Sequence, residues 1–583
     1  MVNTPFIPET APFTLEQRAW LNGFLAGLFA IMPNGQAPGP QLNGAPVKTG
    51  EPLLILFGSQ TGTAEGLAKR VAEQSEQRGF TSRVLALNDY EPANLAQGGK
   101  VIIISSTWGD GDPPDNAVNF WNWLKADNAP RLENLHFAVL GLGDRNYSDF
   151  CGASKKFDSR LEALGAHRLA PRGECDVDYE AVAKSWIDGL WRSLGGSGAP
   201  VSNGRLAETR NGYDRKTPFP ARLLRNVLLN KPGSGKEVRH YEISLDGSGL
   251  AYEVGDALGV VPANCHELVA DTLDALHCQG DESVKVGDAE MTLREALLRH
   301  LDLTKPSSDL LEAVATAAPD CELAGLLAPE RAAELKKWLW GRDVLDILSF
   351  LPVPFTVEQL VPLLRKLSPR LYSISSSPKA HPGEAHLTVS AVRYERLGRE
   401  RKGVASTFLA DRVGAADYVK VFVQPSPGLK PPANSDTSMI MVGPGTGIAP
   451  FRAFLEERQV VGAKGRHWLF FGDQRRDTDF LYQEQLNAWL KDGHLTRLDL
   501  AFSRDQAEKV YVQNRMLENA AELWSWLEAG AHFYVCGDAS RMAKDVDAAL
   551  HKIVETVGGR SADDAKAYVA KLKSDKRYQR DVY

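Results

Sequence analysis

Three loops between residues 59 and 151 carry residue types that bind a phosphate group and a planar ring. The first loop, Ser59-Gln-Thr-Gly-Thr-Ala-Glu65, separates an apolar segment from a segment with helical periodicity. Hydroxyl groups and the free N–H groups at the start of a helix bind phosphate, helped by the helix dipole. The loop has no lysine, so it suits a monoester and is not a Walker loop. A helix cap without a ligand would have the same sequence.

The other two loops, 106–115 and 141–151, place Trp108 and Tyr147 among glycines and acids. Two rings from adjacent loops could hold a planar tricycle by stacking. All three loops follow apolar segments, and doubly wound sheets bind ligands at the carboxyl ends of their strands. This combination resembles flavodoxin, and the resemblance implies FMN. The implied contacts are Ser59, Gln60, Thr61, Gly62, Thr63, Ala64, Ser106, Thr107, Trp108, Gly109, Leu142, Gly143, Asp144, Asn146, Tyr147, Phe150 and Cys151.

A second group of motifs begins at Arg370-Leu-Tyr-Ser373, between two prolines. The arginine can neutralise a pyrophosphate, the tyrosine can stack on a ring, and Ser373 can hydrogen-bond the N5 atom of a flavin. Thirty residues later, Gly403-Val-Ala-Ser406 opens a helix and predicts another phosphate site. Serine-rich turns occur in many loops, so the pair of motifs is stronger evidence than either alone.

A glycine-rich turn at 443–452 follows a strand and opens a helix, which allows the backbone to approach a pyrophosphate closely. Downstream, Arg504 and Lys509 supply two cations, Ser503 a hydroxyl and Tyr511 a ring for stacking. These groups fit a 2′-phosphate and an adenine, so they favour NADPH over NADH. The alternative is that the two cations form an ordinary solvated surface pair.

Three residues far apart in the sequence are candidate catalytic residues. Cys536 ends a strand and the chain closes on Asp581-Val-Tyr583. Cys536 alone could be a simple core residue, as most free cysteines are. Beside a nicotinamide, however, Ser373, Cys536 and Asp581 would form a polar cluster at the hydride path. We expect Tyr583 to cover a flavin ring and to swing away when nicotinamide arrives, because nothing follows it in the chain.

The elements that must position these residues divide the chain into five parts. Strands alternating with helices over 51–195 predict a doubly wound parallel sheet. A Gly/Ser/Pro-rich linker follows at 196–217. Residues 218–435 predict an antiparallel barrel with a helical insertion at about 266–365, and the α/β pattern returns over 436–583. Residues 1–50 predict an amphipathic helix and a linker; the helix either packs on its own domain or contacts another subunit.

Composition excludes several classes of function. A net charge of -7 argues against general nucleic-acid binding, which needs a basic face. Six cysteines without a CxxC pair predict neither a metal centre nor a disulfide framework, and they favour the reducing cytoplasm. No apolar run reaches the ~20 residues that a membrane-spanning helix needs.

Residues 218–583 resemble the ferredoxin–NADP reductase module with the helical insertion of diflavin reductases. Among these, the chain is similar to the flavoprotein components of NADPH-dependent sulfite reductases in its N-terminal helix, in 534–546 and in the tail 577–583. Trp108 departs from that pattern, which has a glutamine there. The FAD contacts implied are Thr304, Arg370, Leu371, Tyr372, Ser373, Thr388, Val389, Ser390, Tyr394, Gly403, Val404, Ala405, Ser406 and Tyr583. The NADPH contacts implied are Gly445, Thr446, Ser503, Arg504, Lys509, Val510, Tyr511, Val512, Gln513 and Asp545.

The resemblance also implies an activity and a partner. It implies electron transfer from NADPH through FAD and FMN to a hemoprotein subunit with siroheme and an iron–sulfur cluster, which forms sulfide for cysteine biosynthesis. A hetero-oligomer is expected, and the N-terminal helix could add homo-oligomer contacts. A different heme or nitrate-reducing acceptor stays open as an alternative, as does a non-catalytic flavodoxin-like scaffold.

Overall fold

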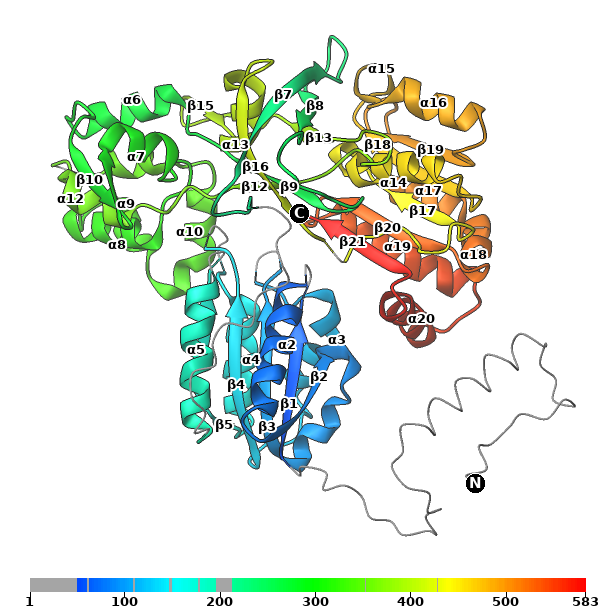
Figure 1. Ribbon diagram of the computed structural model, residues 1–583, viewed down its shortest axis with the longest axis horizontal. Coiled ribbons are helices and arrows are strands. Elements are labelled where there is room, and N and C mark those ends of the chain that lie inside the picture. Colours follow the sequence, from blue (N-terminus) through cyan, green and yellow to red (C-terminus); the bar gives the residue numbers. More distant parts are fainter. Residues whose placement is uncertain are drawn as a thin grey trace, which may run out of the picture.

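The computed structural model describes residues 50–583 apart from 60–61, 109–110, 146–148, 177–178, 196–211, 352 and 427. The expected N-terminal helix and most of the expected linker therefore lie outside the described residues. Figure 1 shows three units: a blue-to-cyan unit, a green and yellow central unit with a lateral helical lobe, and a yellow-to-red C-terminal unit.

The first unit is a parallel sheet covered by helices on both faces. Its strand order is β2-β1-β3-β4-β5, with β6 also paired to β4. Apolar clusters lie on both faces of the sheet, which explains why 101–104 is a continuous buried run. The strands are β1 (Glu51–Gly58), β2 (Phe80–Ala86), β3 (Gly99–Ser106), β4 (Leu135–Leu142), β5 (His167–Arg168) and β6 (Gly173–Cys175). The helices are α2 (Thr63–Glu76), α3 (Val118–Lys125), α4 (Gly152–Ala163) and α5 (Tyr179–Ser193).

The second unit is an antiparallel barrel with strand order β12-β9-β16-β7-β8-β13. An isolated bridge between Ile374 and Leu387 links the end of the first strand to the last and closes it. The strands are β7 (Phe219–Leu228), β8 (Val238–Ser244), β9 (Ala257–Val261), β12 (Arg370–Ser373), β13 (Glu384–Ser390) and β16 (Tyr418–Gln424). A hairpin, β14 (Arg393–Arg396) with β15 (Arg399–Lys402), leads into α13 (Val404–Thr407), which continues as the π-helix η6 (Phe408–Arg412).

The insertion has an apolar core of its own. It is not wholly helical, because a small antiparallel hairpin lies within it. Its elements are α6 (His266–Ala275), β10 (Ser283–Val286), β11 (Ala289–Thr292), α7 (Leu293–Arg299), α8 (Ser308–Ala317), α9 (Glu322–Leu326), α10 (Ala332–Leu339), α11 (Val344–Leu348) and α12 (Val357–Leu360).

The C-terminal unit is a five-stranded parallel sheet, ordered β19-β18-β17-β20-β21, with an apolar cluster on each face. Its strands are β17 (Met439–Val442), β18 (His467–Asp473), β19 (Arg497–Phe502), β20 (His532–Gly537) and β21 (Tyr578–Val582). Its helices are α14 (Ala449–Val460), α15 (Arg476–Asp479), α16 (Gln483–Lys491), α17 (Val512–Glu518), α18 (Ala520–Glu528), α19 (Met542–Thr556) and α20 (Ala562–Ser574).

Short 3-10 helices connect several of these elements: η1 (Leu87–Asp89), η2 (Pro92–Gln97), η3 (Asp115–Ala117), η4 (Pro329–Arg331), η5 (Val361–Leu363) and η7 (Gly445–Ile448). Among the described residues, no helix is both long and apolar enough to cross a membrane.

Candidate functional site

The loop after β1 is shaped to bind an anion at the start of α2. The Ser59 Oγ accepts a hydrogen bond from the Gly62 N–H at 2.9 Å, and Gly62 has a φ of 87° that favours glycine. The N-cap residue of α2, Gly62, makes no side-chain cap hydrogen bond, and the first N–H groups of an α-helix have no partner within the helix itself. Nearby, the Thr107 hydroxyl is buried without a hydrogen-bond partner among the described residues. These donors fit a phosphate ester and a polar ring edge, which is the chemistry that FMN presents.

Trp108 is held in a tight turn by two backbone hydrogen bonds of 2.8 Å with Asp112. Its ring is partly buried and packs against the apolar core of the C-terminal unit. Tyr147, the second predicted ring, lies outside the described residues, as do the predicted contacts Gln60, Thr61, Gly109 and Asn146. Of the two aromatic rings expected to stack on the flavin of FMN, only Trp108 therefore lies among the described residues.

The third loop of this edge packs tightly on its own unit. A Cβ on Gly143 would lie 2.8 Å from the Cys151 backbone nitrogen, so the loop approaches α4 closely. Burial raises the pKa of the Cys151 thiol to about 12, which leaves it protonated. The ring of Phe150 lies 5.1 Å from the Arg145 guanidinium.

Asp144, at the same edge, lies near the basic residues of the insertion and the barrel. Burial lowers the pKa of Lys305, Arg370 adds to this shift, and the carboxylates of Asp302 and Asp144 oppose it. The loops at the carboxyl end of the first sheet therefore face the second predicted flavin site.

Arg370 is positioned to meet a pyrophosphate. Its Nη1 donates to the Ser368 carbonyl oxygen at 2.9 Å, and its Nη2 lies 3.8 Å from the Asp302 Oδ2. That carboxylate oxygen is buried and has no hydrogen-bond partner among the described residues, while the Asp302 Oδ1 accepts from Thr304. The guanidinium thus keeps donors free for a phosphate. Leu371 lies between Arg370 and Tyr372, which are less exposed, and is itself 48% exposed.

Several predicted FAD contacts have side chains that are already engaged. The Thr388 hydroxyl lies 2.6 Å from the Tyr482 hydroxyl, and Val389 is buried in the barrel core. The Ser406 Oγ accepts from the Val392 N–H at 3.1 Å and donates to the carbonyl oxygen of Gly403, where the turn begins. Val404 and Ala405 are also buried. At these positions the backbone, rather than the side chain, is the group available to a cofactor.

In the C-terminal unit, the glycine-rich turn lies directly against the end of β20. A Cβ on Gly447 would lie 2.1 Å from the Cys536 carbonyl oxygen, and Gly445 has a φ of 58°. In the loop that follows the edge strand β19, Arg504 and Lys509 are exposed, and neither side chain pairs with an acid within the described part of the chain. Tyr511 is 45% exposed. Two free cations and an exposed ring fit a nucleotide that carries an additional phosphate.

Not every residue of the 509–513 segment can reach a ligand with its side chain. Val512 is buried in the core beneath the sheet, and Val510 packs beside it. The Gln513 amide nitrogen donates to the Asp545 Oδ2 at 3.2 Å, which links these two predicted contacts.

The structure brings the three candidate catalytic residues together. The Ser373 hydroxyl donates to the Asp581 Oδ2 at 2.5 Å, and the Cys536 Sγ lies 3.9 Å from the same oxygen. The register of the parallel strands β20 and β21 pairs Cys536 with Asp581. Ser373 is the last residue of the barrel strand β12. Burial raises the pKa of the Asp581 carboxyl and raises that of the Cys536 thiol well above its usual value.

The backbone of Tyr583 is hydrogen-bonded at the end of the sheet. Its backbone N–H donates to the Gly537 carbonyl oxygen at 3.0 Å, and its carbonyl oxygen accepts from the Ala539 N–H at 3.1 Å. The backbone of the last residue therefore extends the hydrogen bonding of β21 to β20, while the expectation that the Tyr583 ring covers a flavin and swings away stays a prediction. The ring remains 62% exposed, and its hydroxyl lies 2.9 Å from the Thr446 Oγ1.

Comparisons with known proteins agree with this geometry. Family models for flavodoxin, an FAD binding domain and an oxidoreductase NAD-binding domain match residues 55–186, 212–408 and 441–548. The sulfite reductase (NADPH) flavoprotein alpha-component of Bacillus subtilis (strain 168) is 45% identical, over 100% of this chain and 99% of its own length. Its namesakes in Vibrio parahaemolyticus and Mannheimia succiniciproducens are 42% and 41% identical, over 97% and 100% of this chain and 92% and 100% of theirs.

The chain belongs to the sulfite reductase (NADPH) flavoprotein alpha-component family. It is an oxidoreductase with a flavodoxin domain for FMN, a domain for FAD and a domain for NADPH. The predicted family and cofactors are thus confirmed.

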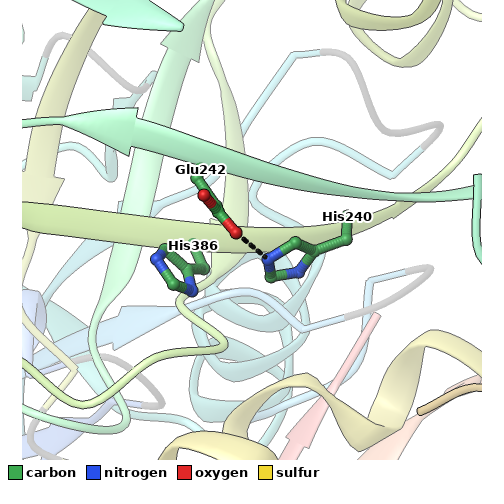
Figure 2. Close-up of side chains that lie close together, drawn as sticks. All are labelled: His240, Glu242 and His386. Carbon is green, nitrogen blue, oxygen red and sulfur yellow. Dashed lines mark ion pairs between the residues drawn. The ribbon is translucent and has the colours of Figure 1, made fainter. Parts of the chain in front are cut away.

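This flavoprotein also contains a buried polar network that the motifs did not reveal. Figure 2 shows Glu242 reaching between the imidazoles of His240 and His386, which come from the paired strands β8 and β13. The His240 Nε2 lies 3.4 Å from the Glu242 Oε1, and its Nδ1 lies 2.9 Å from the hydroxyl of Tyr482, which precedes α16. The network therefore joins the barrel to the nucleotide domain.

The charges in this network are set by burial. Burial, with a further effect from Arg452, lowers the pKa of His240 to about 2 and that of His386 to about 4, so both are neutral at pH 7. By residue type, these side chains could also ligate a metal, since their ligand atoms lie within 4.8 Å of one another. The neighbouring Arg452 guanidinium opposes a further cation, which favours a hydrogen-bonded interdomain link. The available signal in the sequence was the spacing His240-x-Glu242, because residues two apart on a strand lie on the same face.

Proposed function

We propose that this flavoprotein transfers electrons from NADPH to a hemoprotein subunit of sulfite reductase that carries siroheme and an iron–sulfur cluster. One observation carries the proposal: the Ser373 Oγ lies 2.5 Å from the Asp581 Oδ2. This contact joins the FAD motif on β12 to the end of the nucleotide-domain sheet. Hydride transfer requires such an arrangement, because the donor and acceptor rings must meet between the two domains.

Different residues of this chain would bind the phosphate groups of the three cofactors. The start of α2 with Ser59 would hold the FMN phosphate, Arg370 would neutralise the FAD pyrophosphate, and Arg504 with Lys509 would clamp the NADPH 2′-phosphate. When bound, FAD would supply a hydride acceptor for NADPH, and the two flavins together would allow the two electrons of that hydride to leave one at a time, with its proton released to the site or to solvent.

The remaining roles fall to the cluster at the domain junction. Ser373 would orient the flavin through its hydroxyl oxygen, and the Asp581 carboxylate would fix that hydroxyl by accepting its hydrogen bond at Oδ2. When the carboxyl holds a proton at Oδ2, this hydrogen bond would reverse and Oδ2 would donate to the Ser373 Oγ. Cys536 would bound the nicotinamide side of the path, and the Tyr583 ring would exclude water from it. The raised pKa of the Asp581 carboxyl supports its role as a proton holder.

The names of the relatives support a partner for this chain. The relatives named alpha-components imply a separate hemoprotein partner. We propose that the complex is a cytoplasmic hetero-oligomer, that residues 14–32 contribute a subunit contact, and that the segment 196–217 lets the FMN domain move between FAD and the hemoprotein.

The test uses the purified chain loaded with both flavins. NADPH should reduce cytochrome c, and sulfide should form only after a siroheme hemoprotein and sulfite are added. If cytochrome c is not reduced, the electron-transfer proposal is wrong. If cytochrome c is reduced but the siroheme hemoprotein yields no sulfide while another heme or nitrate-reducing protein is reduced, the chain serves that other acceptor.

A further inference from the structure

The ring of Trp108 belongs to the flavodoxin domain but packs on the apolar core of another domain. Trp108 follows β3, and its partly buried ring lies against the apolar cluster that the nucleotide-domain sheet forms with α17, α18, α19 and α20. Ala539 and Met542 are partly buried against the same cluster. Figure 1 shows the blue-to-cyan unit below both the helical lobe and the C-terminal unit. The Trp108 ring is thus an apolar contact between two domains.

The turn that carries Trp108 is fastened to its own domain. The Lys156 Nζ on α4 donates to the Gly111 carbonyl oxygen at 2.8 Å and lies 3.2 Å from the Asp112 Oδ1. Gly111 has a φ of 97°, and a Cβ there would lie 2.0 Å from the Asp149 Oδ2, so glycine lets the turn approach the start of α4. Because the turn is held from behind, the contact of its ring restrains the whole flavodoxin domain.

The flavodoxin domain makes a second contact, of the opposite chemical kind, with the insertion. Burial lowers the pKa of Arg365, and the carboxylates of Asp302, Asp144 and Asp176 oppose that shift. Asp302 belongs to the insertion, whereas Asp144 follows β4 and Asp176 follows β6 of the first sheet. Salt screens a charge contact of this kind, whereas an apolar contact does not depend on charge. The two contacts should therefore respond differently to salt.

The residue type at position 108 decides whether the apolar contact forms. Trp108 departs from the pattern of the related flavoproteins, which has a glutamine there. A glutamine amide placed against an apolar core would lose its hydrogen bonds to water without gaining others, and this is unfavourable. The indole ring has a large apolar surface and gains by the same burial. Trp108→Gln is therefore the substitution that removes the contact.

We propose that Trp108 is the apolar anchor that docks the flavodoxin domain on the nucleotide domain, as a positioning residue for electron transfer from FAD to FMN. This inference rests on the proposed function, since it takes the flavodoxin domain as the site of FMN and the barrel as the site of FAD. The anchor releases whenever the flavodoxin domain turns to the hemoprotein. Its strength therefore sets the share of docked molecules.

The first experiment is small-angle X-ray scattering of the oxidised full-length chain, with both flavins in excess, from low to high salt. Trp108→Gln should lower the ratio of docked to undocked molecules about tenfold, which corresponds to about 1.4 kcal/mol and is the scale of one partly buried aromatic contact. Its radius of gyration should exceed that of the wild type, most clearly at high salt, because only the charge contact is left. Trp108→Phe, which keeps an apolar ring, should stay nearly as compact as the wild type.

Stopped-flow kinetics measure the same ratio through two rates. If docked molecules predominate, Trp108→Gln should accelerate cytochrome c reduction by the pre-reduced protein by up to about tenfold, because undocking limits that step. If undocked molecules predominate, it should slow electron transfer between the flavins by the same factor. Trp108 is also an expected FMN contact, so bound FMN is measured in each variant. Compactness of the oxidised protein does not depend on flavin potentials and separates docking from an altered FMN site.

Trp121→Gln is the matched control, because it makes the same substitution in the same domain. The Trp121 ring lies 5.6 Å from the Phe157 ring and packs on the core of the flavodoxin domain itself. This variant should lower Tm without changing the radius of gyration or either rate. Wild-type compactness at every salt concentration together with wild-type rates in Trp108→Gln would overturn the inference. The same changes in Trp121→Gln would also overturn it, because they would show a general loosening of the domain.

A failure of the anchor can be told apart from a failure of the proposed function. If NADPH bleaches the FAD absorbance and the wild type reduces cytochrome c while Trp108→Gln matches it in compactness and rates, only the anchor is wrong. If NADPH does not reduce the FAD of the wild type, the proposed function fails, and the scattering comparison still decides whether Trp108 docks the domains.

Discussion

The choice of NADPH over NADH should depend on two exposed cations, Arg504 and Lys509. Neither side chain has an acidic partner among the described residues, so both are free to bind the 2′-phosphate. A hydrogen bond to a charged group contributes about 1.5–3 kcal/mol. Because both residues are exposed, we take the lower value for each, which totals about 3 kcal/mol. Since 1.4 kcal/mol corresponds to a factor of ten, the double alanine variant should lose about 150-fold in kcat/KM for NADPH.

The assay is steady-state reduction of cytochrome c with each coenzyme. NADH lacks the 2′-phosphate, so its kcat/KM should change by less than about threefold. Lys491→Ala, which removes an exposed charge at the end of α16, controls for a general change in surface charge. Adding salt should reduce the wild-type preference for NADPH and leave the variant nearly unaffected. Equal losses for NADPH and NADH would refute the assignment of the two cations to the 2′-phosphate.

Three further substitutions test the flavin sites. Burial raises the pKa of Asp581, so its favourable contribution to stability is full below the unfolded-state value near 3.9 and is lost as pH rises through the folded-state value. Asp581→Asn should therefore flatten the dependence of Tm on pH and slow flavin reduction by NADPH in stopped flow; a Tm profile parallel to the wild type would contradict this. Tyr583→Ala keeps the backbone bonds of the tail, so Tm should change little while the kcat/KM ratio shifts toward NADH; an unchanged ratio would remove Tyr583 from coenzyme selection. Ser59→Asp can still accept from Gly62 but should repel the FMN phosphate, so chromatography of released flavins should find FAD without FMN, and retained FMN would refute the phosphate site.

The elements carrying the strongest sequence patterns were predictable. The apolar runs 53–57 and 101–104 indicated buried parallel strands, and they form the centre of the first sheet. The proximity of Ser373, Cys536 and Asp581 also followed from motifs, although 208 residues separate the first from the last. The two runs could be predicted because parallel strands covered on both faces are continuously apolar. The ends of parallel strands meet at one edge of a sheet, which accounts for Cys536 and Asp581, and Ser373 was predicted from its motif on the barrel strand β12.

Side-chain use inside the site could not be predicted, because it depends on neighbours from distant segments. Thr388 and Ser406 match motif positions, yet their hydroxyls bond to Tyr482 and to the Val392 N–H. The hairpin in the insertion was missed because the Leu- and Ala-rich composition around it favours helices. The signal for that hairpin was the pair 287–288, Gly-Asp, between two short strands.

The pairing of β21 limits how the chain near Tyr583 can move at the proposed hydride path. Val582 pairs with Gly537 in the sheet, and both backbone groups of Tyr583 are hydrogen-bonded. Moving the tail would break this pairing and expose the Asp581 carboxyl, which burial and the Ser373 hydroxyl hold in place. Rotating the ring alone breaks only the 2.9 Å hydrogen bond to Thr446, which costs about 0.5–1.5 kcal/mol. If Tyr583 covers a flavin as proposed, the lower cost favours rotation of its side chain over movement of the tail as the way to uncover that flavin.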